Sequence, residues 1–409
     1  MKYLILLGDG MADYPLAELE GRTPLEAAHT PHMDRMAVRG TVGQFCPIPD
    51  GLPPGSDVGN LSLFGYDPRR AFRGRAAIEA VSQGIQLGDD EVAFRCNLVT
   101  LEDGRMRDFT AGHISSAEGA EIIATLQERL GGDFPLLFHP GVSYRHLAIV
   151  RASAAATLDQ LVGLECEPPH NITGQDADPY LPRGDGQAMI QELITRSREV
   201  LTDHPVNVRR TANGDLPATS IWLWGQGKAP SMEHYDSKFH MSGAVVSAVD
   251  LVKGIGLCAG LEVLQVPGAT GWLDTDYAGK VSAALGALSR HDFAYVHIEA
   301  PDETAHQGRI DLKIQAIEDF DREVVGPCLA WAEERGDCRV LAAPDHFTLI
   351  STKTHAGGPV PFVLCGPGIP ANGQAAYSER TAAASGIRIA DGYQLVESML
   401  RDAAPAFAG

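Results

Sequence analysis

Closely spaced cysteine pairs are missing from the 409-residue sequence, which has seven scattered cysteines and no Cys-x-x-Cys motif. A chain with an odd, unclustered set of cysteines is not organised around disulfides or a metal-thiolate cluster. We therefore expect reduced thiols, buried as small hydrophobic side chains, in a cytoplasmic protein.

Basic residues are also scarce, with 33 lysines and arginines against 53 aspartates and glutamates, and the formal net charge is −20. Such a chain repels the phosphates of nucleic acids and anionic lipids, and no run of basic residues offsets the repulsion. We expect neither kind of partner. A small anionic substrate needs local cations that overcome this negative field, and bound metal ions supply them most directly.

Long hydrophobic runs and the common nucleotide-binding loop are absent as well. No stretch of about 18 uncharged apolar residues occurs, so no membrane-spanning helix is predicted. The apolar run at residues 3–7 is too short for a signal peptide and indicates a buried strand. The missing Gly-x-x-x-x-Gly-Lys-Ser/Thr motif counts against a kinase of the usual kind.

Short, continuous apolar runs are what the sequence has instead, and helical patterns separate many of them. Such runs are typical of strands covered on both faces, as in parallel sheets, and their alternation with helices predicts a doubly wound α/β core. One helix should begin at the capping box of Ser115 and Glu118, and another should follow Ile314 until Pro327 interrupts it. The runs lie at 3–7, 221–224, 244–249, 263–266, 293–298, 340–343 and 362–365.

The middle of the chain has a different pattern. Residues 92–100 and the turn at 102–104 predict a hairpin, and a proline-rich stretch covers 167–182. We expect residues 90–200 to form a smaller α+β domain. This domain would be inserted into a catalytic domain formed by residues 1–89 and 201–409.

Carboxylates and imidazoles follow three of the expected strands. Each of these residues alone also suits an ordinary turn or helix start, but ligands gather at the carboxyl ends of strands in open α/β sheets. Mixed histidine and carboxylate sets suit Zn²⁺ or Mn²⁺, so the shared placement predicts a metal site. The candidate ligands are Asp9, Asp302, His306, Asp345, His346 and His355.

Ser56 lies in the Gly-Ser-Asp-Val-Gly-Asn segment at 55–60, at an expected helix start. Alone it could be a helix-capping serine, yet a helix N-terminus also stabilises an alkoxide or a bound phosphate. A serine hydroxyl is a poor nucleophile without a base or a metal. Because no Gly-x-Ser-x-Gly elbow is present, we favour a metal-activated serine that accepts a phosphoryl group over an acyl-transfer triad.

These residues appear in the order of the alkaline phosphatase superfamily, and the chain more closely resembles cofactor-independent phosphoglycerate mutases of the archaeal type. The stretches at 63–68, 94–97, 204–207 and 268–271 match as well, so the resemblance covers nearly the whole chain. It implies an alkaline-phosphatase-like three-layer core with a mostly parallel sheet and an inserted substrate domain that acts as a lid. It also implies interconversion of 3-phosphoglycerate and 2-phosphoglycerate through a phosphoserine.

The resemblance further implies two divalent ions, Mn²⁺ or Zn²⁺ with Mg²⁺ also suitable, and no organic cofactor. One ion would be held by Asp302, His306 and His355, and the other by Asp9, Ser56, Asp345 and His346. A small phosphorylated substrate also needs cationic side chains, because the arginine fork binds phosphate and carboxylate in two places. The expected substrate-binding residues are Asn60, Arg75, Arg145, Arg210 and Lys238.

One segment departs from the family pattern. Archaeal mutases carry Asp-Arg-Arg-Ala-Gly-Arg, where this chain has Asp-Phe-Thr-Ala-Gly-His at 108–113. The loss of arginines resembles a bacterial subgroup proposed to act as homoserine kinases. Formation of O-phosphohomoserine is therefore an alternative. A metal-dependent phosphatase, phosphodiesterase or sulfatase and a catalytically silent binding protein are further alternatives. The sequence indicates no oligomeric state.

Overall fold

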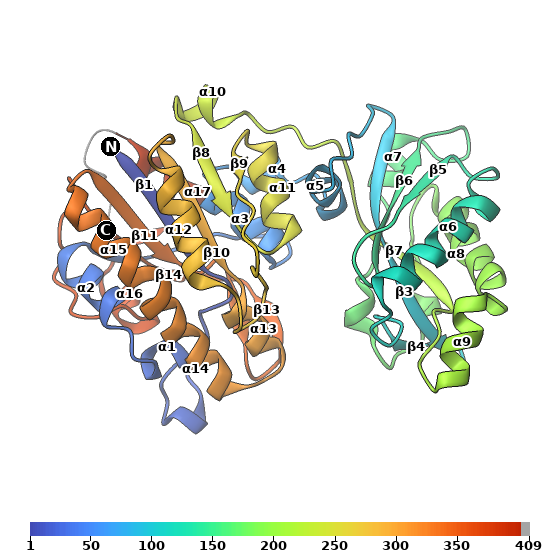
Figure 1. The fold of residues 1–409 in the computed structure, drawn as a ribbon, viewed down its shortest axis with the longest axis horizontal. Helices are drawn as coiled ribbons and strands as arrows, with labels where there is room; N and C mark the ends of the chain where they lie inside the picture. The colour runs from blue at the N-terminus through green and yellow to red at the C-terminus, as the bar shows by residue number, and fades with distance from the viewer. Residues whose placement is uncertain (402–409) are drawn as a thin grey trace. The chain divides into compact units, whose positions relative to one another are not determined.

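The computed structural model describes residues 1–401, which form two compact units (Figure 1). The first unit combines Met1–Phe72 with Met232–Gly409, of which 402–409 lie outside the described residues, and the second is Arg73–Ser231. The second unit is thus longer at both ends than the predicted 90–200. The reason is packing, because α5 (Arg75–Ser82) and β7 (Ser220–Lys228) both lie against β3 (Glu91–Glu102).

The first unit is built on an eight-stranded sheet with β1 near its centre. β1 pairs in parallel with β10 on one side and with β11 on the other, and only β14 runs antiparallel to both of its neighbours. The largely parallel α/β sheet that the apolar runs predicted is confirmed. The order is β15 (Arg388–Ile389), β2 (Thr41–Phe45), β14 (Val360–Cys365), β11 (Cys338–Ala343), β1 (Lys2–Gly8), β10 (Phe293–Ile298), β8 (Gly243–Val246) and β9 (Glu262–Val263).

Helices cover both faces of this sheet. Neighbouring side chains of a strand point to opposite faces, so the continuous apolar strands present apolar side chains on both. Leu4 and Leu6 of β1 lie in a core with α2 (Pro31–Arg39), α12 (Tyr277–Ala287) and α15 (Gly326–Arg335). Figure 1 shows α12 in front of β10. On the other face, Tyr295 of β10 stacks on Phe64 with ring centroids 4.2 Å apart. The remaining helices of this unit are α1 (Pro24–Ala27), α3 (Ser56–Leu63), α4 (Pro68–Ala71), α10 (Tyr235–Phe239), α11 (Asp250–Cys258), α13 (Ala300–His306), α14 (Ile310–Asp319), α16 (Glu379–Ala384) and α17 (Tyr393–Leu400).

The helix that follows Ile314 does not stop at Pro327, so that expectation was wrong. Helix α14 continues through a π-helical segment, Phe320–Val325, directly into α15. Pro327 occupies the first turn of α15, where the change from π to α hydrogen bonding accommodates a residue without an N–H.

The second unit has a five-stranded antiparallel sheet in which β7 pairs with β3. The predicted hairpin and the capping box of Ser115 and Glu118 are both confirmed. The apolar run at 221–224 belongs to this sheet and not to the parallel one. Its continuous pattern comes from burial on both faces, with Leu223 in one core and Trp222 in another. The other elements are β4 (Arg105–Asp108), β5 (Leu136–His139), β6 (Arg145–Arg151), α6 (Ser116–Leu130), α7 (Leu158–Val162), α8 (Gln187–Thr202) and α9 (Pro205–Asn213).

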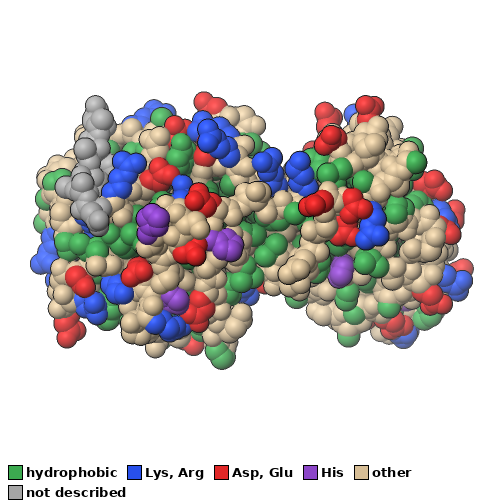
Figure 2. All heavy atoms as spheres, turned by 90° about the horizontal axis from the view of Figure 1, so that it is seen from above, with side chains coloured by type: hydrophobic (Ala, Val, Ile, Leu, Met, Phe, Trp, Pro, Cys, Tyr) green, Lys and Arg blue, Asp and Glu red, His purple; other side chains and the backbone are tan. Residues whose placement is uncertain are grey.

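The surface and the thiols agree with the composition. On the face drawn in Figure 2, basic side chains form small groups beside acidic ones and no continuous basic field. Within residues 1–401, no helix is long and apolar enough to cross a membrane. All seven cysteines are free, and none has an exposed side chain.

Candidate metal centre and active site

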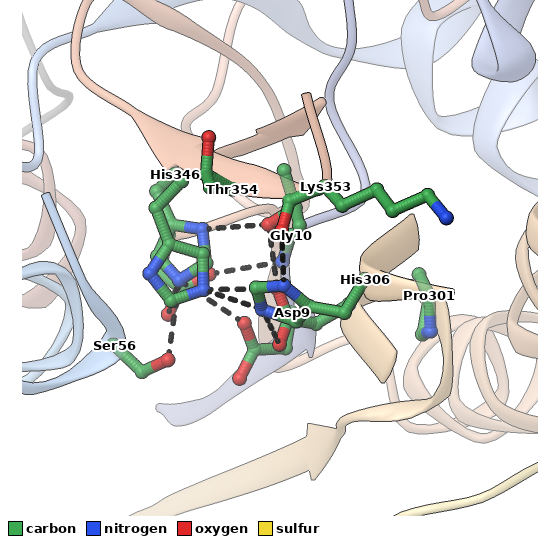
Figure 3. A network of polar contacts seen from close by, with 12 residues as sticks. Asp9, Gly10, Ser56, Pro301, His306, His346, Lys353 and Thr354 are labelled. Carbon is green, nitrogen blue, oxygen red and sulfur yellow. Dashed lines mark hydrogen bonds and ion pairs between the residues drawn. The ribbon is translucent and has the colours of Figure 1, made fainter. Parts of the chain in front are cut away.

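The predicted ligands meet at the carboxyl edge of the parallel strands. Asp9 follows β1, Asp302 lies on the helix that follows β10, and Asp345 comes two residues after β11. All three carboxylates are buried. Figure 3 shows Asp9, Ser56, His306 and His346 reaching toward one another from separate segments of the chain. The convergence predicted from strand ends is therefore present within the first unit.

One ligand group surrounds the Nε2 atom of His346. This atom lies 3.1 Å from Ser56 Oγ, 3.3 Å from Asp9 Oδ1 and 3.5 Å from Asp345 Oδ2. Atoms that bind one tetrahedral ion at about 2.1 Å are about 3.4 Å from each other. The spacing therefore matches a single shared cation.

A second group surrounds Asp302. On α13 the i, i+4 spacing places Asp302 and His306 on one face, with His306 Nε2 3.2 Å from Asp302 Oδ2. His355 comes from the hairpin of β12 (Phe347–Leu349) and β13 (Thr354–Ala356), and its Nε2 lies 3.3 Å from Asp302 Oδ1. The Nε2 atoms of His306 and His355 are 2.9 Å apart, and His306 Nδ1 bonds the carbonyl of Lys353. Because Nδ1–H donates to the Lys353 carbonyl, the lone pair of His306 lies on Nε2, which faces Asp302 and His355.

Electrostatics show that this donor set suits cations. Burial raises the pKa of Asp9 well above its ordinary value, and the neighbouring Asp345 and Asp302 carboxylates raise it further. Burial also raises the pKa of Asp345 to about 6. Asp9 Oδ1 is buried without a hydrogen-bond partner. Buried carboxylates that repel one another, one with an unsatisfied oxygen, fit divalent metal ions, which supply the missing positive charge.

The sequence around Ser56 explains how α3 approaches the site. Ser56 begins the helix, and Gly59 and Asn60 follow at the i+3 and i+4 positions on the same face. A Cβ on Gly59 would lie only 2.6 Å from the Asp345 carbonyl oxygen, so glycine permits the close contact. Asn60 Nδ2 donates to Asp345 Oδ2 at 2.8 Å, and Asn60 Oδ1 accepts from the Tyr295 hydroxyl.

Three of the expected substrate-binding residues have their polar groups bound to the protein itself. Asn60 is completely buried and orients Asp345. Lys238 pairs with Glu397 at 2.9 Å. Arg210 is buried in the second unit, where it pairs with Glu118 and donates to backbone carbonyls, including that of Ala111. The structure thus gives these residues positioning or packing contacts where we expected substrate contacts.

The other two expected residues, Arg75 and Arg145, lie in an arginine group of the second unit. Arg75 Nε is 2.9 Å and Arg95 Nε 3.0 Å from the Glu79 carboxylate. Although burial raises the pKa of Glu79, Arg95, Arg75 and Arg145 hold it below its ordinary value. Arg145 has an exposed side chain over the Tyr144 ring. Three arginines around the single carboxylate of Glu79 give this group a net positive charge, which suits the binding of an anion.

Arg95 was missed in the sequence, although an arginine within an apolar strand was a usable signal. Its guanidinium lies 4.4 Å from the Trp224 ring centre. An aromatic group continues from there through His170 to Phe109, with ring centroids 5.6 Å and 5.9 Å apart. The segment that departs from the family pattern therefore contributes Phe109 to an aromatic group beside the arginines.

Two further polar residues of the metal centre were also missed. His297 Nε2 lies 2.9 Å from Asp9 Oδ2, and its Nδ1 is 3.1 Å from Ser247 Oγ. Thr348 Oγ1 lies 2.5 Å from Asp302 Oδ1. His297 could have been found, because a polar side chain inside a fully buried strand needs a buried partner. Thr348 lies in no motif that singles it out.

The fold, the donor set and the serine define a metal-dependent phosphoryl-transfer enzyme, and comparisons with known proteins specify the family. A family model described as 2,3-bisphosphoglycerate-independent phosphoglycerate mutase matches residues 37–207. A relative from Geobacter sulfurreducens, described as a probable enzyme of this name, is 52% identical over 405 residues, which are 98% of this chain and 100% of the relative. A relative of the same name from Methanothrix thermoacetophila is 49% identical over 401 residues, again 98% and 100% of the two chains.

Solved structures agree with these relatives. A structure from Pyrococcus horikoshii has a TM-score of 0.80 and 29% identity, and covers 100% of this chain and 99% of that one. A cofactor-independent phosphoglycerate mutase from Thermoplasma acidophilum has a TM-score of 0.62 and 27% identity, with 98% and 100% covered. The chain belongs to the 2,3-bisphosphoglycerate-independent phosphoglycerate mutases, the family that its motifs resembled.

Chelation should inactivate the protein and lower its melting temperature, because removal of cations leaves the buried carboxylates repelling one another. At an ion concentration 100 times its Kd, bound metal stabilises the fold by about 2.7 kcal/mol. Activity and thermal unfolding are measured after EDTA treatment and again after dialysis into Mn²⁺. Full activity in excess chelator would contradict the metal site.

Ser56→Ala should lower kcat at least ~10³-fold, because the nucleophile is lost. The fold should persist, since the substitution removes one half-buried hydroxyl. Ser62→Ala on the same helix is the matched control, because within residues 1–401 the Ser62 hydroxyl bonds only the Pro47 carbonyl. The control should keep its kcat even where it melts earlier. Wild-type turnover in Ser56→Ala would remove this serine from the reaction.

Proposed function

We propose that this protein interconverts 3-phosphoglycerate and 2-phosphoglycerate through a phosphoserine at Ser56. The observation that carries the proposal is the Ser56 hydroxyl, which lies 3.1 Å from His346 Nε2 within a cluster of buried carboxylates. Relatives described as 2,3-bisphosphoglycerate-independent phosphoglycerate mutases match the chain over nearly its full length. They favour this activity over homoserine phosphorylation and over simple hydrolysis.

The donor set supports two divalent ions, with Mn²⁺ or Zn²⁺ preferred for mixed nitrogen and oxygen ligands. Such ions would lower the pKa of the serine hydroxyl and neutralise the phosphoryl oxygens. In our proposal Asp302, His306 and His355 hold one ion, and Asp9, Ser56, Asp345 and His346 hold the other. The interatomic distances within each group support this division.

The transfer occurs in two in-line steps. In the first, Ser56 Oγ gives up its hydroxyl proton and forms a bond to phosphorus while the bond to one glycerate oxygen breaks, and that oxygen keeps the electron pair and takes a proton. In the second, the other glycerate hydroxyl loses its proton and attacks the phosphoserine, and Ser56 Oγ leaves with the electron pair and regains a proton. The position of Ser56 at the start of α3 favours the phosphorylated state, because the helix N-terminus carries partial positive charge.

The second unit is the proposed substrate domain, and its arginine group is the proposed site for the anionic groups of the substrate. Arg75 and Arg95 are held by Glu79, whereas Arg145 is exposed over an aromatic ring and has no paired carboxylate at hydrogen-bond distance among the described residues. Arg145 is therefore the residue best placed to pair with a phosphate or carboxylate. We expect the protein to act in the cytoplasm, which its free thiols support.

Arg145→Met should raise KM about 10- to 100-fold, the equivalent of one charge-assisted hydrogen bond of about 1.5–3 kcal/mol. Thermal stability should hardly change, because the side chain is exposed. Arg151→Met is the matched control, since Arg151 is exposed on the same strand and pairs with Glu91. Equal KM values for the two variants would argue against a substrate role for Arg145.

Phosphorus NMR tests the proposed reaction directly. We expect metal-loaded protein to convert 3-phosphoglycerate into 2-phosphoglycerate with no nucleotide present, and to leave homoserine unchanged when ATP is supplied. Appearance of O-phosphohomoserine would instead establish the kinase. Release of inorganic phosphate without isomer formation would establish a phosphatase.

A further inference from the structure

The hydroxyl of Thr348 joins the two ligand groups of the metal centre. Its Oγ1 lies 2.5 Å from Asp302 Oδ1, in one group, and 3.1 Å from His346 Nδ1, in the other. Thr348 is fully buried, so no solvent competes for these two contacts. One side chain therefore touches a proposed ligand of each ion.

The direction of the two hydrogen bonds follows from the number of protons. An ionised Asp302, beside His306 and His355, can only accept a hydrogen bond, so the single hydroxyl proton of Thr348 points to it. The contact with His346 then requires that Nδ1–H donates to the threonine oxygen. A neutral His346 in this tautomer has its lone pair on Nε2, the atom that faces Ser56 and Asp9.

The surroundings hold Thr348 in this position. Its carbonyl accepts a hydrogen bond of 2.6 Å from the buried Lys313 ammonium, and its N–H donates to the Ala12 carbonyl. Gly10, at a positive φ of 58°, lies so close that a Cβ there would be 2.3 Å from Thr348 Oγ1. The hydroxyl is therefore packed from the side of β1 and held from the backbone.

We propose that Thr348 is a positioning residue that selects the metal-binding tautomer of His346 and orients Asp302, so that the two metal positions are coupled through one hydroxyl. This inference rests on the proposed metal site. It adds that loss of the hydroxyl weakens both positions at once, although Thr348 itself touches neither substrate nor Ser56.

Three variants and a control test the proposal by binding of Mn²⁺ to metal-free protein, measured by titration calorimetry. Thr348→Val keeps the side-chain shape and removes the hydroxyl, and should weaken binding about 10- to 100-fold at both positions. Thr348→Ser retains the hydroxyl and should stay within about threefold of the wild type. Thr348→Ala serves as a second hydroxyl-free variant should valine prevent folding. The control is Thr352→Val, on the exposed part of the same segment.

Histidine ¹⁵N NMR of the metal-free protein gives a readout independent of activity. In the wild type and in Thr348→Ser, the resonances of His346 should show a protonated Nδ1 and an unprotonated Nε2. In the variants without a hydroxyl, the two tautomers should exchange. A merely structural role would lower the melting temperature without this change.

The outcomes separate the two levels of the inference. A wild-type protein that binds no divalent ion would overturn the metal site and the proposal together. If the wild type binds Mn²⁺ and both Thr348→Val and Thr348→Ala bind it with the same affinity, the role of Thr348 alone is overturned. A Thr348→Ser protein as weak as Thr348→Val would show that the hydroxyl is not the determining group.

Discussion

Mutual repulsion among buried carboxylates is the constraint on which the site depends. Asp9, Asp302 and Asp345 come from three neighbouring strand ends, and no arginine or lysine among the described residues forms an ion pair with any of them. Burial makes the repulsion strong, because little water screens the charges. The fold holds the three groups together nevertheless: burial raises the pKa values of Asp9 and Asp345, whereas His306 and His355, against the effect of burial, lower the pKa of Asp302. The protein is therefore organised so that metal ions complete its core.

Neutral hydrogen-bond partners orient these carboxylates without cancelling their charge. His297 lies against Asp9, Asn60 donates to Asp345, and Thr348 donates to Asp302. A lysine or arginine in any of these places would compete with the metal for the same charge. A neutral partner instead fixes one oxygen and leaves the charge of the carboxylate available, which is the usual arrangement around metal ligands.

The second unit uses the opposite electrostatic arrangement. Glu79 gathers Arg75 and Arg95 within hydrogen-bond distance, and it holds these like-charged side chains near Arg145. Phe109 stands in the segment where the family resemblance led us to expect arginines, yet the arginine group lies beside its aromatic neighbours. The departure at 108–113 therefore changes part of the surroundings and does not remove the positive charge of this unit.

The sequence alone predicted the kind of sheet and the carboxylates and histidines that come together at its edge. Continuous apolar runs predict strands buried on two faces, and polar residues just after such runs lie at one edge of a parallel sheet. The same reasoning placed 221–224 in the wrong sheet, because burial on both faces gives one pattern in parallel and antiparallel sheets alike. It also ended the helix at Pro327, since sequence periodicity does not reveal a π segment.

Only the tertiary structure decided which polar groups pair with which. Asn60 turned toward Asp345, which is 285 residues away in the sequence, and Arg210 toward the carbonyl of Ala111, which is 99 residues away. Thr348 acquires its importance in the same way. An ordinary threonine in sequence becomes a link between two ligand groups once β1, α13 and the segment after β11 are brought together, because hydrogen bonds depend on positions in space that local patterns do not encode.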